Sequence, residues 1–175
     1  DNASGGDCTS IGNWDFSAKT CILTTDVAET IQIDSDNIIL DGNGHALTGS
    51  ETGFGVYLYQ RTGVTIKDTN LKNFSIGILL YHSNNNIISN NISSGNSIGI
   101  SLAYSNYNTL SGNTFNSNNY SGIGLDRSHN NVLSANIANL NTYYGINLYS
   151  SGNNTLANNT TNQNNHRTFF CFCQI

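Results

Sequence analysis

One glycine recurs along the chain at an almost constant interval, and this period limits the fold more than any other feature. Successive copies stand about 22 to 23 residues apart, a period typical of solenoid proteins. The copies are Gly55, Gly77, Gly99, Gly122 and Gly145, and they open similar phrases: GVYLY, GILLY, GISLA, GIGLD and GINLY. The repeats of a solenoid bury their apolar faces only against neighbouring repeats.

Apolar residues alternate with other residues inside each phrase. A β-branched residue follows the glycine in every copy: Val56, Ile78, Ile100, Ile123 and Ile146. Leucine stands two positions further on, at Leu58, Leu80, Leu102, Leu125 and Leu148. Alternation at period two indicates a strand with one face turned inward. We therefore expect stacked columns of these residues that form one continuous core.

Asparagine, the commonest residue, forms three further columns in step with the glycines. The first column holds Asn86, Asn108, Asn131 and Asn154; the second holds Asn91, Asn113, Asn136 and Asn159; the third holds Asn96, Asn118, Asn141 and Asn164. Asparagine tolerates left-handed backbone, and its amide supplies two donors and an acceptor. We expect asparagine ladders at the bends between short strands. Solvent loops filled at random would not keep this register over four coils.

These columns predict an all-β chain, a right-handed parallel β-helix (solenoid) of about six coils, each about 22 to 23 residues long. A leucine-rich repeat has a similar length, but its LxxLxLxxN phrase is not found. We expect residues 1–21 to form an N-terminal cap, 22–167 the β-helix, and 168–175 an apolar C-terminal strand. If Thr168 takes the place of the next glycine, Phe169 and Cys171 would point inward, and Phe170 and Phe172 outward.

Composition and charge exclude several classes of partner. Only 10% of residues are charged and the net charge is -5, so no basic stripe exists for a nucleic acid. No apolar run is long enough to span a membrane. The chain starts at Asp1 and contains no Met, as expected of a secreted protein without its leader; an excerpt of a longer protein would look the same.

Cysteines and glycosylation sequons favour an extracellular location. Cys8 and Cys21 bracket a segment apart from the repeats and suit a disulfide in an oxidising compartment. Asn-X-Ser/Thr sequons occur at Asn2, Asn73, Asn91, Asn119, Asn153, Asn158 and Asn159. We expect a cell-surface or secreted glycoprotein.

The repeat resembles the pectate-lyase-like superfamily of β-helices, specifically the NosD-type and archaeal cell-surface repeats. The matching phrases are NIILDGNGHALTG (37–49), SNNNIISNN (83–91), SHNNVLSAN (128–136) and SSGNNTLANN (150–159). The resemblance covers roughly residues 22–165. It implies the fold, but such repeats serve lyases, glycan-binding modules, copper-maturation proteins and surface-layer proteins alike, so it does not select an activity.

The regular coils contain one small candidate catalytic patch, formed by Asp126, Arg127 and His129. A polysaccharide lyase needs clustered carboxylates for Ca²⁺, and an inverting glycosidase needs two carboxylates flanking the sugar. Asp126 has no carboxylate above or below it in its own column. The alternative is a solvated surface ion pair. Asp41 and His45, in the DGNGH turn, are explained by turn chemistry.

No metal or cofactor is expected. Copper would need clustered His, Cys or Met side chains. The chain has no Met, and its histidines fall in different columns: His45, His82, His129 and His166.

Tyrosines lie at or near the outward side of the first strand in several coils and are the predicted binding surface: Tyr57, Tyr59, Tyr81, Tyr104, Tyr107 and Tyr149. Tyrosine rings on a flat sheet can hold sugar rings or pack against another subunit. The alternative is that tyrosine is simply a good strand former on a half-exposed face.

The C-terminal FFCFC segment is unusually apolar for a solenoid end. We expect its residues to contact a neighbouring subunit head to tail, or else to form a lid: Phe169, Phe170, Cys171, Phe172 and Cys173. The preferred function is therefore a non-enzymatic extracellular structural protein, a surface-layer or filament subunit that associates with itself or with other surface proteins. The alternative is a carbohydrate-binding module, or a polysaccharide lyase or hydrolase.

Overall fold

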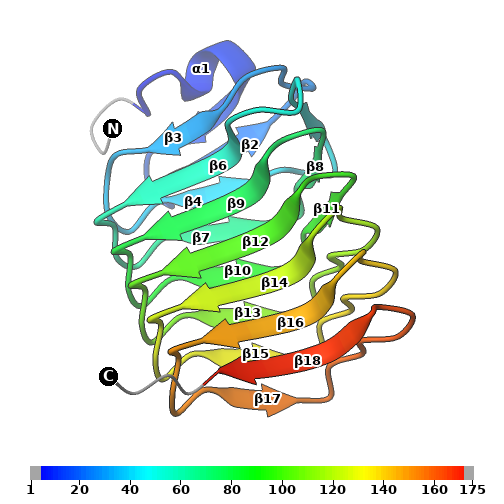
Figure 1. Cartoon of the computed structure of the whole chain (residues 1–175). Coiled ribbons are helices and arrows are strands. Elements are labelled where there is room, and N and C mark those ends of the chain that lie inside the picture. The colour runs from blue at the N-terminus through cyan, green and yellow to red at the C-terminus, as the bar shows by residue number, and fades with distance from the viewer. Residues whose placement is uncertain (1–4, 172–175) are drawn as a thin grey trace.

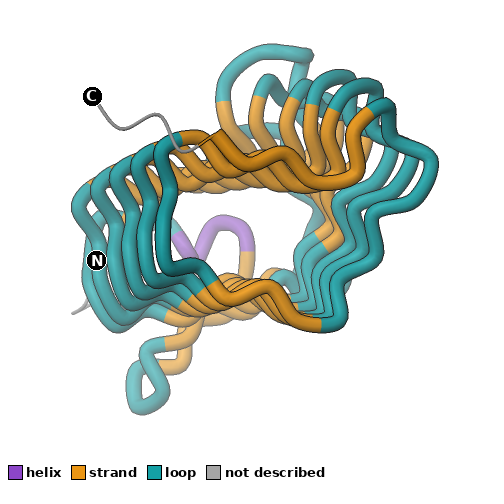
Figure 2. The backbone as a smooth tube through the Cα atoms, turned by 60° about the horizontal axis from the view of Figure 1, so that its bottom comes forward, coloured by secondary structure: helices purple, strands orange, loops and turns teal. Residues whose placement is uncertain are grey.

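The computed structural model describes residues 5–171, except for the side chains of Arg167 and of residues 169–171. The chain winds into a stack of about six similar coils, each built from short strands joined by bends (Figure 1). Figure 2 shows the coils lying over one another, with the helix at the N-terminal end. The predicted right-handed parallel β-helix is confirmed.

Three sheets run along the stack. Sheet A has the order β1-β2-β4-β7-β10-β13-β15-β17, with bounds Gly12–Asp15, Thr20–Leu23, Ile39–Asp41, Thr65–Lys67, Ile87–Ser89, Thr109–Ser111, Val132–Ser134 and Thr155–Ala157. Sheet B has the order β11-β8-β5, with bounds Ile92–Ser94, Asn70–Lys72 and Ala46–Thr48. Isolated bridges continue sheet B from Ile92 through Thr114 and Ile137 to Thr160.

Sheet C contains the long strands that carry the glycine phrases. Its order is β18-β16-β14-β12-β9-β6-β3, with bounds His166–Cys171, Tyr144–Tyr149, Ser121–Asp126, Ile98–Ala103, Ile76–Tyr81, Phe54–Tyr59 and Ile31–Ile33. Every pairing in sheets B and C is parallel, for example Ile100 with Ile78 and with Ile123.

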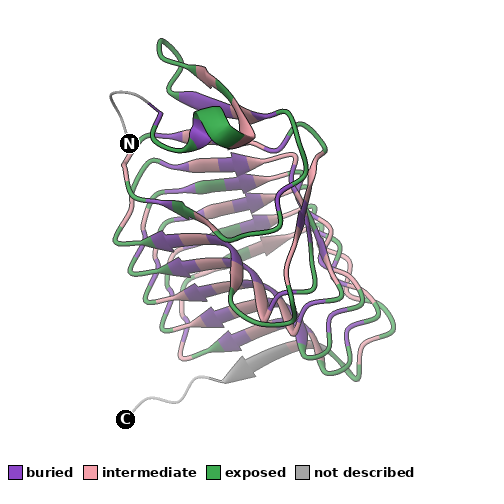
Figure 3. Cartoon of the chain, turned by 90° about the horizontal axis from the view of Figure 1, so that it is seen from above, coloured by how far each residue is buried: buried purple, intermediate pink, exposed green. Residues whose placement is uncertain are grey.

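The inward columns form the core that the alternation predicts. Ile100 and Leu102 are fully buried, as are Ile88 and Leu110 from sheet A. Figure 3 shows buried segments repeating at the same place in successive coils. Because each coil is covered by the coils beside it, the core is one continuous column that extends along the axis of the solenoid.

The repeated glycine is required by close packing of the coils. A Cβ atom on Gly99 would lie 2.6 Å from the carbonyl oxygen of Gly122 and 3.0 Å from Cβ of Phe115. A Cβ atom on Gly77 or Gly122 would likewise lie within 3.0 Å of backbone and side-chain atoms of neighbouring segments. The glycine therefore lets the strand bend against the adjacent coil, and a larger residue would push the coils apart.

All three predicted asparagine columns are hydrogen-bonded ladders. Within each ladder, an amide oxygen accepts from the backbone nitrogen and the Nδ2 of the asparagine one coil earlier. For Asn113 and Asn136 these distances are 3.1 Å and 2.9 Å. The inner members are buried, with Asn91, Asn108 and Asn113 fully closed to solvent. The ladders satisfy buried backbone groups that the bends leave unpaired.

The left-handed backbone expected at the ladder asparagines lies elsewhere. The ladder residue Asn108 has an ordinary φ, whereas Tyr107, immediately before it, has a φ of 59°. Asn85, Asn130 and Asn153 occupy the equivalent position with φ of 57°. The ladder residues are selected for hydrogen bonding, and their neighbours make the turn.

A serine ladder, which the sequence analysis did not identify, runs beside the first asparagine ladder. The backbone nitrogen of Ser83 donates to Ser105 Oγ at 3.0 Å, and that of Ser105 donates to Ser128 Oγ at 2.9 Å. Ser128 donates in the same way to Ser151 at 3.0 Å. All four serines are buried. Their hydroxyl oxygens accept hydrogen bonds from backbone nitrogens in the bend that follows the strands of sheet C.

The N-terminal end is closed by α1, which spans Cys8–Ile11, and by β1, which pairs antiparallel with β2. The expected disulfide between Cys8 and Cys21 is present, with Cα atoms 5.8 Å apart, and ties α1 to β2 of sheet A. Cys8, Cys21 and Leu23 join the buried core at this end.

The C-terminal strand is shifted by a single position from its expected register. β18 pairs Phe170 with Leu148 and Phe169 with Asn147, so Phe170, and not Phe169, takes the register of the inward column. The cause is the coil length. His166 pairs with Tyr144, which makes this coil shorter by a single position than the preceding coil, where Tyr144 pairs with Ser121. Phe172 and Cys173 lie outside the described residues.

Candidate functional site

Three columns of side chains face outward from sheet C. The first precedes the repeated glycine and holds Phe54, Ile76, Ile98, Ser121 and Tyr144. The middle column holds Tyr57, Leu79, Ser101, Gly124 and Asn147. The third, at the ends of the strands, holds Tyr59, Tyr81, Ala103, Asp126 and Tyr149. The columns are therefore bulky on β6 and β9, smaller on β12 and β14, and bulky again on β16.

This change in size produces a shallow depression of about 350 Å³, which we call the outer groove. Ser101 and Gly124, from β12 and β14, lie at its floor, and Tyr144 and Tyr149 of β16 line it at either end of their strand. Tyr120, from the loop before β14, lines it as well. A groove with small residues between tyrosines is suited to a flat ligand ring.

The outer groove also contains polar atoms that are closed to solvent and have no hydrogen-bond partner. They are Ser121 Oγ, Asp126 Oδ1 and Asn147 Oδ1, three of the four such side-chain atoms among the described residues. The fourth, Trp14 Nε1, is at the N-terminal end. Each unpaired group costs about 1–3 kcal/mol. Their concentration in one depression makes the outer groove the candidate binding surface.

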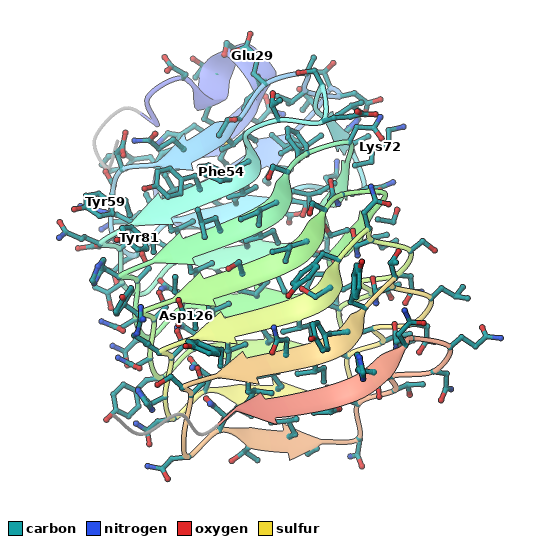
Figure 4. The ribbon with its side chains drawn as sticks, viewed as in Figure 1. Glu29, Phe54, Tyr59, Lys72, Tyr81 and Asp126 are labelled. Atoms are coloured by element: carbon teal, nitrogen blue, oxygen red, sulfur yellow. A yellow bond between two sulfur atoms is a disulfide. The ribbon has the colours of Figure 1, made fainter. Side chains whose placement is uncertain are left out.

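A strip of rings follows the third column on the side of the groove towards the N-terminal coils. Tyr59 stacks on Tyr81 with ring centroids 5.8 Å apart, and Tyr81 meets Tyr104 edge-on at 6.1 Å. His82 stacks on Tyr104 at 4.9 Å, and the guanidinium of Arg127 lies 5.1 Å from the centre of the Tyr104 ring. Figure 4 shows Tyr59, Tyr81 and Asp126 along the same edge of the sheet.

Backbone conformation explains how this strip is assembled. His82, Tyr104 and Arg127 occupy the same position in successive coils and have φ of 51°, 51° and 46°. The left-handed residue ends the strand and directs its side chain beside the last outward residue of the coil. Rings from two columns thereby interleave along one corner of the solenoid.

The other predicted tyrosines are not all in the strip. Tyr57 lies on the middle column against Phe54, with centroids 5.2 Å apart, and burial raises the pKa of its hydroxyl. Tyr149 lines the outer groove. Tyr107 is 60% exposed and belongs to the next bend, after the serine ladder position.

Sequence reasoning missed a second aromatic cluster at the opposite end of the strands. Tyr120 lies 5.4 Å from Tyr143 and 5.6 Å from Tyr144, measured between ring centroids, and Tyr144 stacks on His166 at 5.2 Å. A signal existed, because the residue before each repeated glycine faces outward. Reading that column would have identified Tyr144, and reading the middle column would have identified the small floor.

The structure brings two of the three candidate catalytic residues together. Asp126 Oδ2 lies 3.7 Å from Arg127 Nη1, and the same nitrogen donates to the Tyr104 hydroxyl. His129 is held separately, since its Nδ1 accepts from the backbone nitrogen of Gly152 at 2.9 Å. Asp126 is the single carboxylate among the described residues that line the outer groove. A pair of carboxylates for glycoside hydrolysis is therefore not assembled there.

A larger pocket of about 730 Å³ lies at the N-terminal end, beneath the cap. Its apolar lining includes Trp14, Ile31 and Ile33, and Asp26 and Glu29 are among its acidic residues. The pKa of Asp26 is lowered, mainly because its carboxylate accepts from the Ala46 backbone nitrogen and also contacts His45. This pocket lies between the cap, formed by α1 and β1, and the irregular first coil.

The sequons differ in accessibility. Asn91 is fully buried, and its Nδ2 donates to Ile66 O and Asn113 Oδ1 at 2.9 and 3.1 Å, so the folded chain does not present it for glycosylation. Asn159 uses its Nδ2 to bond Leu133 O at 2.8 Å. The remaining described sequons are exposed, at Asn73, Asn119, Asn153 and Asn158. Asn2 lies outside the described residues.

The stacked coils, the ladders and the outward columns define a right-handed parallel β-helix protein. The chain belongs to the family described as periplasmic copper-binding protein (NosD), which matches residues 12–170. Comparison with curated protein sequences gave no match. Among the residues that the structure describes, no helix is long and apolar enough to cross a membrane.

The chain is similar in fold to crystal structures of the periplasmic alginate epimerase AlgG. One structure of AlgG is 24% identical over 74% of this chain, with a TM-score of 0.65. A double mutant of AlgG is 21% identical over 86% of the chain, with a TM-score of 0.69, and a single mutant is 21% identical over 82%, with a TM-score of 0.62. The chain spans 31%, 38% and 40% of those proteins, respectively.

The described residues do not fit the copper that the family's description names. Cys8 and Cys21 are bonded to each other, the chain has no Met, and the described residues include no group of three or more His, Cys, Asp or Glu that could hold a metal ion. Four histidines contact four different sets of neighbours: His45, His82, His129 and His166.

Proposed function

We propose that this chain is an exported carbohydrate-binding protein that holds a glycan on the outer face of sheet C. The observation that carries the proposal is the outer groove, where Ser121, Asp126 and Asn147 have shielded, unpaired polar atoms beside tyrosine rings. Sugars match this chemistry because their ring faces stack on aromatic side chains and their hydroxyls both donate and accept hydrogen bonds.

Other properties of the chain support export and binding. The disulfide between Cys8 and Cys21 requires an oxidising compartment, and the family is described as periplasmic. The epimerase of similar fold acts, by its name, on a polysaccharide. Binding without turnover is favoured because Asp126 is the single groove carboxylate among the described residues and His129 is held by the adjacent coil.

A glycan array tests the proposal, followed by calorimetric titration of the full chain with the best oligosaccharide. We expect Tyr144→Ala and Tyr149→Ala each to weaken binding about tenfold, because each variant removes a ring from the lining of the groove. Phe16→Ala serves as the control, since Phe16 is 69% exposed in the turn between β1 and β2. Binding that survives both tyrosine substitutions would place the ligand elsewhere, and the absence of any glycan ligand would reject the function.

The second candidate is a structural subunit that assembles end to end. It is favoured by β17 and β18, which are the last strands of sheets A and C within the described residues. An open strand edge is a template for pairing with another chain. The strand edge at Phe169, Phe170 and Cys171 would make the contact. Light scattering after size exclusion tests this candidate, because a strict monomer at high concentration would reject it.

A further inference from the structure

We infer that the outer groove selects neutral, hydroxyl-rich glycans and discriminates against polymers of uronic acids. The inference rests on the proposed function, and it specifies the class of ligand. It also separates this chain from the alginate epimerase of similar fold, whose name identifies an acidic polysaccharide.

Asp126 is the only ionisable group with a full negative charge among the described residues that line the groove. Arg127 is its nearest cationic neighbour, but the guanidinium lies over the Tyr104 ring, donates to the Tyr104 hydroxyl, and is 3.7 Å from Oδ2. Oδ1 has no partner. The guanidinium therefore compensates the charge at Oδ2 but leaves Oδ1 unpaired, and a ligand carboxylate bound beside Oδ1 would meet like charge.

Asp126 Oδ1 and Asn147 Oδ1 can only accept, so the ligand must donate to both. Ser121 Oγ can donate or accept. A uronate sugar keeps its ring hydroxyls, but in place of the hydroxymethyl donor of a neutral hexose it carries a carboxylate that only accepts. Because both oxygens are closed to solvent, binding requires a rotation about the terminal torsion of Asp126 or Asn147, which is broad for both residue types.

Calcium could join Asp126 to a ligand carboxylate, but it requires six to eight oxygen ligands. The described residues contain no group of three or more acidic, His or Cys side chains that could hold a metal ion. The groove therefore cannot recruit a uronate through a preformed cation site, and its charge favours a neutral sugar.

The experiment uses matched pairs of polymers. Pectate, alginate and a glucuronan are arrayed, each beside its carboxyl-reduced form, together with neutral glucans, mannans and galactans, all in EDTA. The two members of a pair differ only in whether each sugar carries a carboxylate or a hydroxymethyl group. We expect the full chain to bind neutral members, with each reduced polymer bound at least tenfold more tightly than its acidic parent.

Two variants locate the discrimination. Asp126→Asn keeps the shape but removes the charge, and we expect the gap within a pair to shrink about tenfold. Glu29→Gln is the matched control, because Glu29 is an exposed carboxylate at the N-terminal end of the solenoid, far from Asp126 (Figure 4). The gap should not change in this control.

The outcomes separate the two claims. Equal or tighter binding of the acidic members would overturn the inference while leaving a carbohydrate-binding function in place. Acidic binding that appears only when Ca²⁺ replaces EDTA would overturn it as well. A gap that persists in Asp126→Asn would show that Asp126 is not the selective group. Binding to no glycan of either kind would reject the proposed function itself.

Discussion

The side-chain oxygen of Asn131 accepts two hydrogen bonds from Asn108, 2.8 Å from its backbone nitrogen and 3.1 Å from its Nδ2. The same Nδ2 also donates to Ser83 O, at 3.0 Å, in the preceding coil. One asparagine side chain therefore joins three successive coils. Because these groups are fully buried, their hydrogen bonds cannot be replaced by water.

Asn108→Ala should be among the most destabilising polar substitutions. It removes the acceptor used by the backbone nitrogen and Nδ2 of Asn86, and it leaves Ser83 O without its Nδ2 donor. Unpaired buried groups cost about 1–3 kcal/mol each, so we expect a loss of about 3 kcal/mol. Urea unfolding followed by circular dichroism measures it. Asn119→Ala, at an exposed site outside the ladders, should change the free energy of unfolding by less than about 0.5 kcal/mol.

Gly99→Ala should destabilise the fold by about 1–3 kcal/mol, because the added methyl group would overlap the carbonyl of Gly122. Gly152→Ala is the matched control. A Cβ there would meet only the His129 ring, at 3.6 Å, and the residue has no positive φ. Thermal unfolding of both variants compares the two sites. Equal unfolding midpoints for the two variants would contradict the close packing of Gly99 against the coil that carries Gly122.

The bend at Leu140 offers a stabilising substitution. Leu140 has a φ of 59° and is 54% exposed, so its backbone is strained and its side chain contributes little burial. A left-handed conformation costs about 1–2 kcal/mol for most residues and less for asparagine, so Leu140→Asn should raise the free energy of unfolding by about 1 kcal/mol. Thr142→Asn, at a nearby exposed residue with ordinary φ, should not. Urea unfolding of both variants makes the comparison, and equal effects would mean that the bend carries no strain at Leu140.

The core and the ladders could be predicted from the sequence because both require one residue type at one place in every coil. Ile78, Leu110 and Asn113 therefore belong to columns of like residues that recur at a nearly constant spacing in the sequence. The outer groove could not be found in this way, since it arises where Ser101 and Gly124 fail to repeat the bulk of Tyr57 and Leu79. A depression arises from differences between coils, whereas the period of the sequence reports only what the coils have in common.

Two expectations from the sequence, the register of the C-terminal strand and the positions of the left-handed residues, were wrong for identifiable physical reasons. The C-terminal register was displaced because the coil between Tyr144 and His166 is shorter by a single position than the coil before it, and strand alternation reverses with such a shift. Left-handed residues such as Tyr107 and Leu140 carry no local signal, because hydrogen bonds to adjacent coils impose the conformation. Local propensity describes the isolated turn, and the stack overrides it.

The pair formed by Lys67 and Asp41 predicts a dependence of stability on alkaline pH. Lys67 Nζ donates to Asp41 Oδ2 across adjacent strands of sheet A, and this hydrogen bond raises the pKa of the ammonium group. The unfolded chain would have the ordinary pKa of about 10.4. Because the folded pKa is higher, the stabilisation is complete below the unfolded value and is lost as the pH rises through the folded value.

Lys67→Met removes this interaction, and the free energy of unfolding should fall by no more than about 1 kcal/mol, because the lysine side chain is 35% exposed. The difference from the unsubstituted chain should be constant between about pH 7 and 9 and should shrink above about pH 10.4. Urea titrations across this range measure it, with Lys19→Met, in the exposed turn between β1 and β2, as the control. A difference that stays constant far into the alkaline range would mean that Lys67 stabilises the sheet through its aliphatic chain and not through its charge.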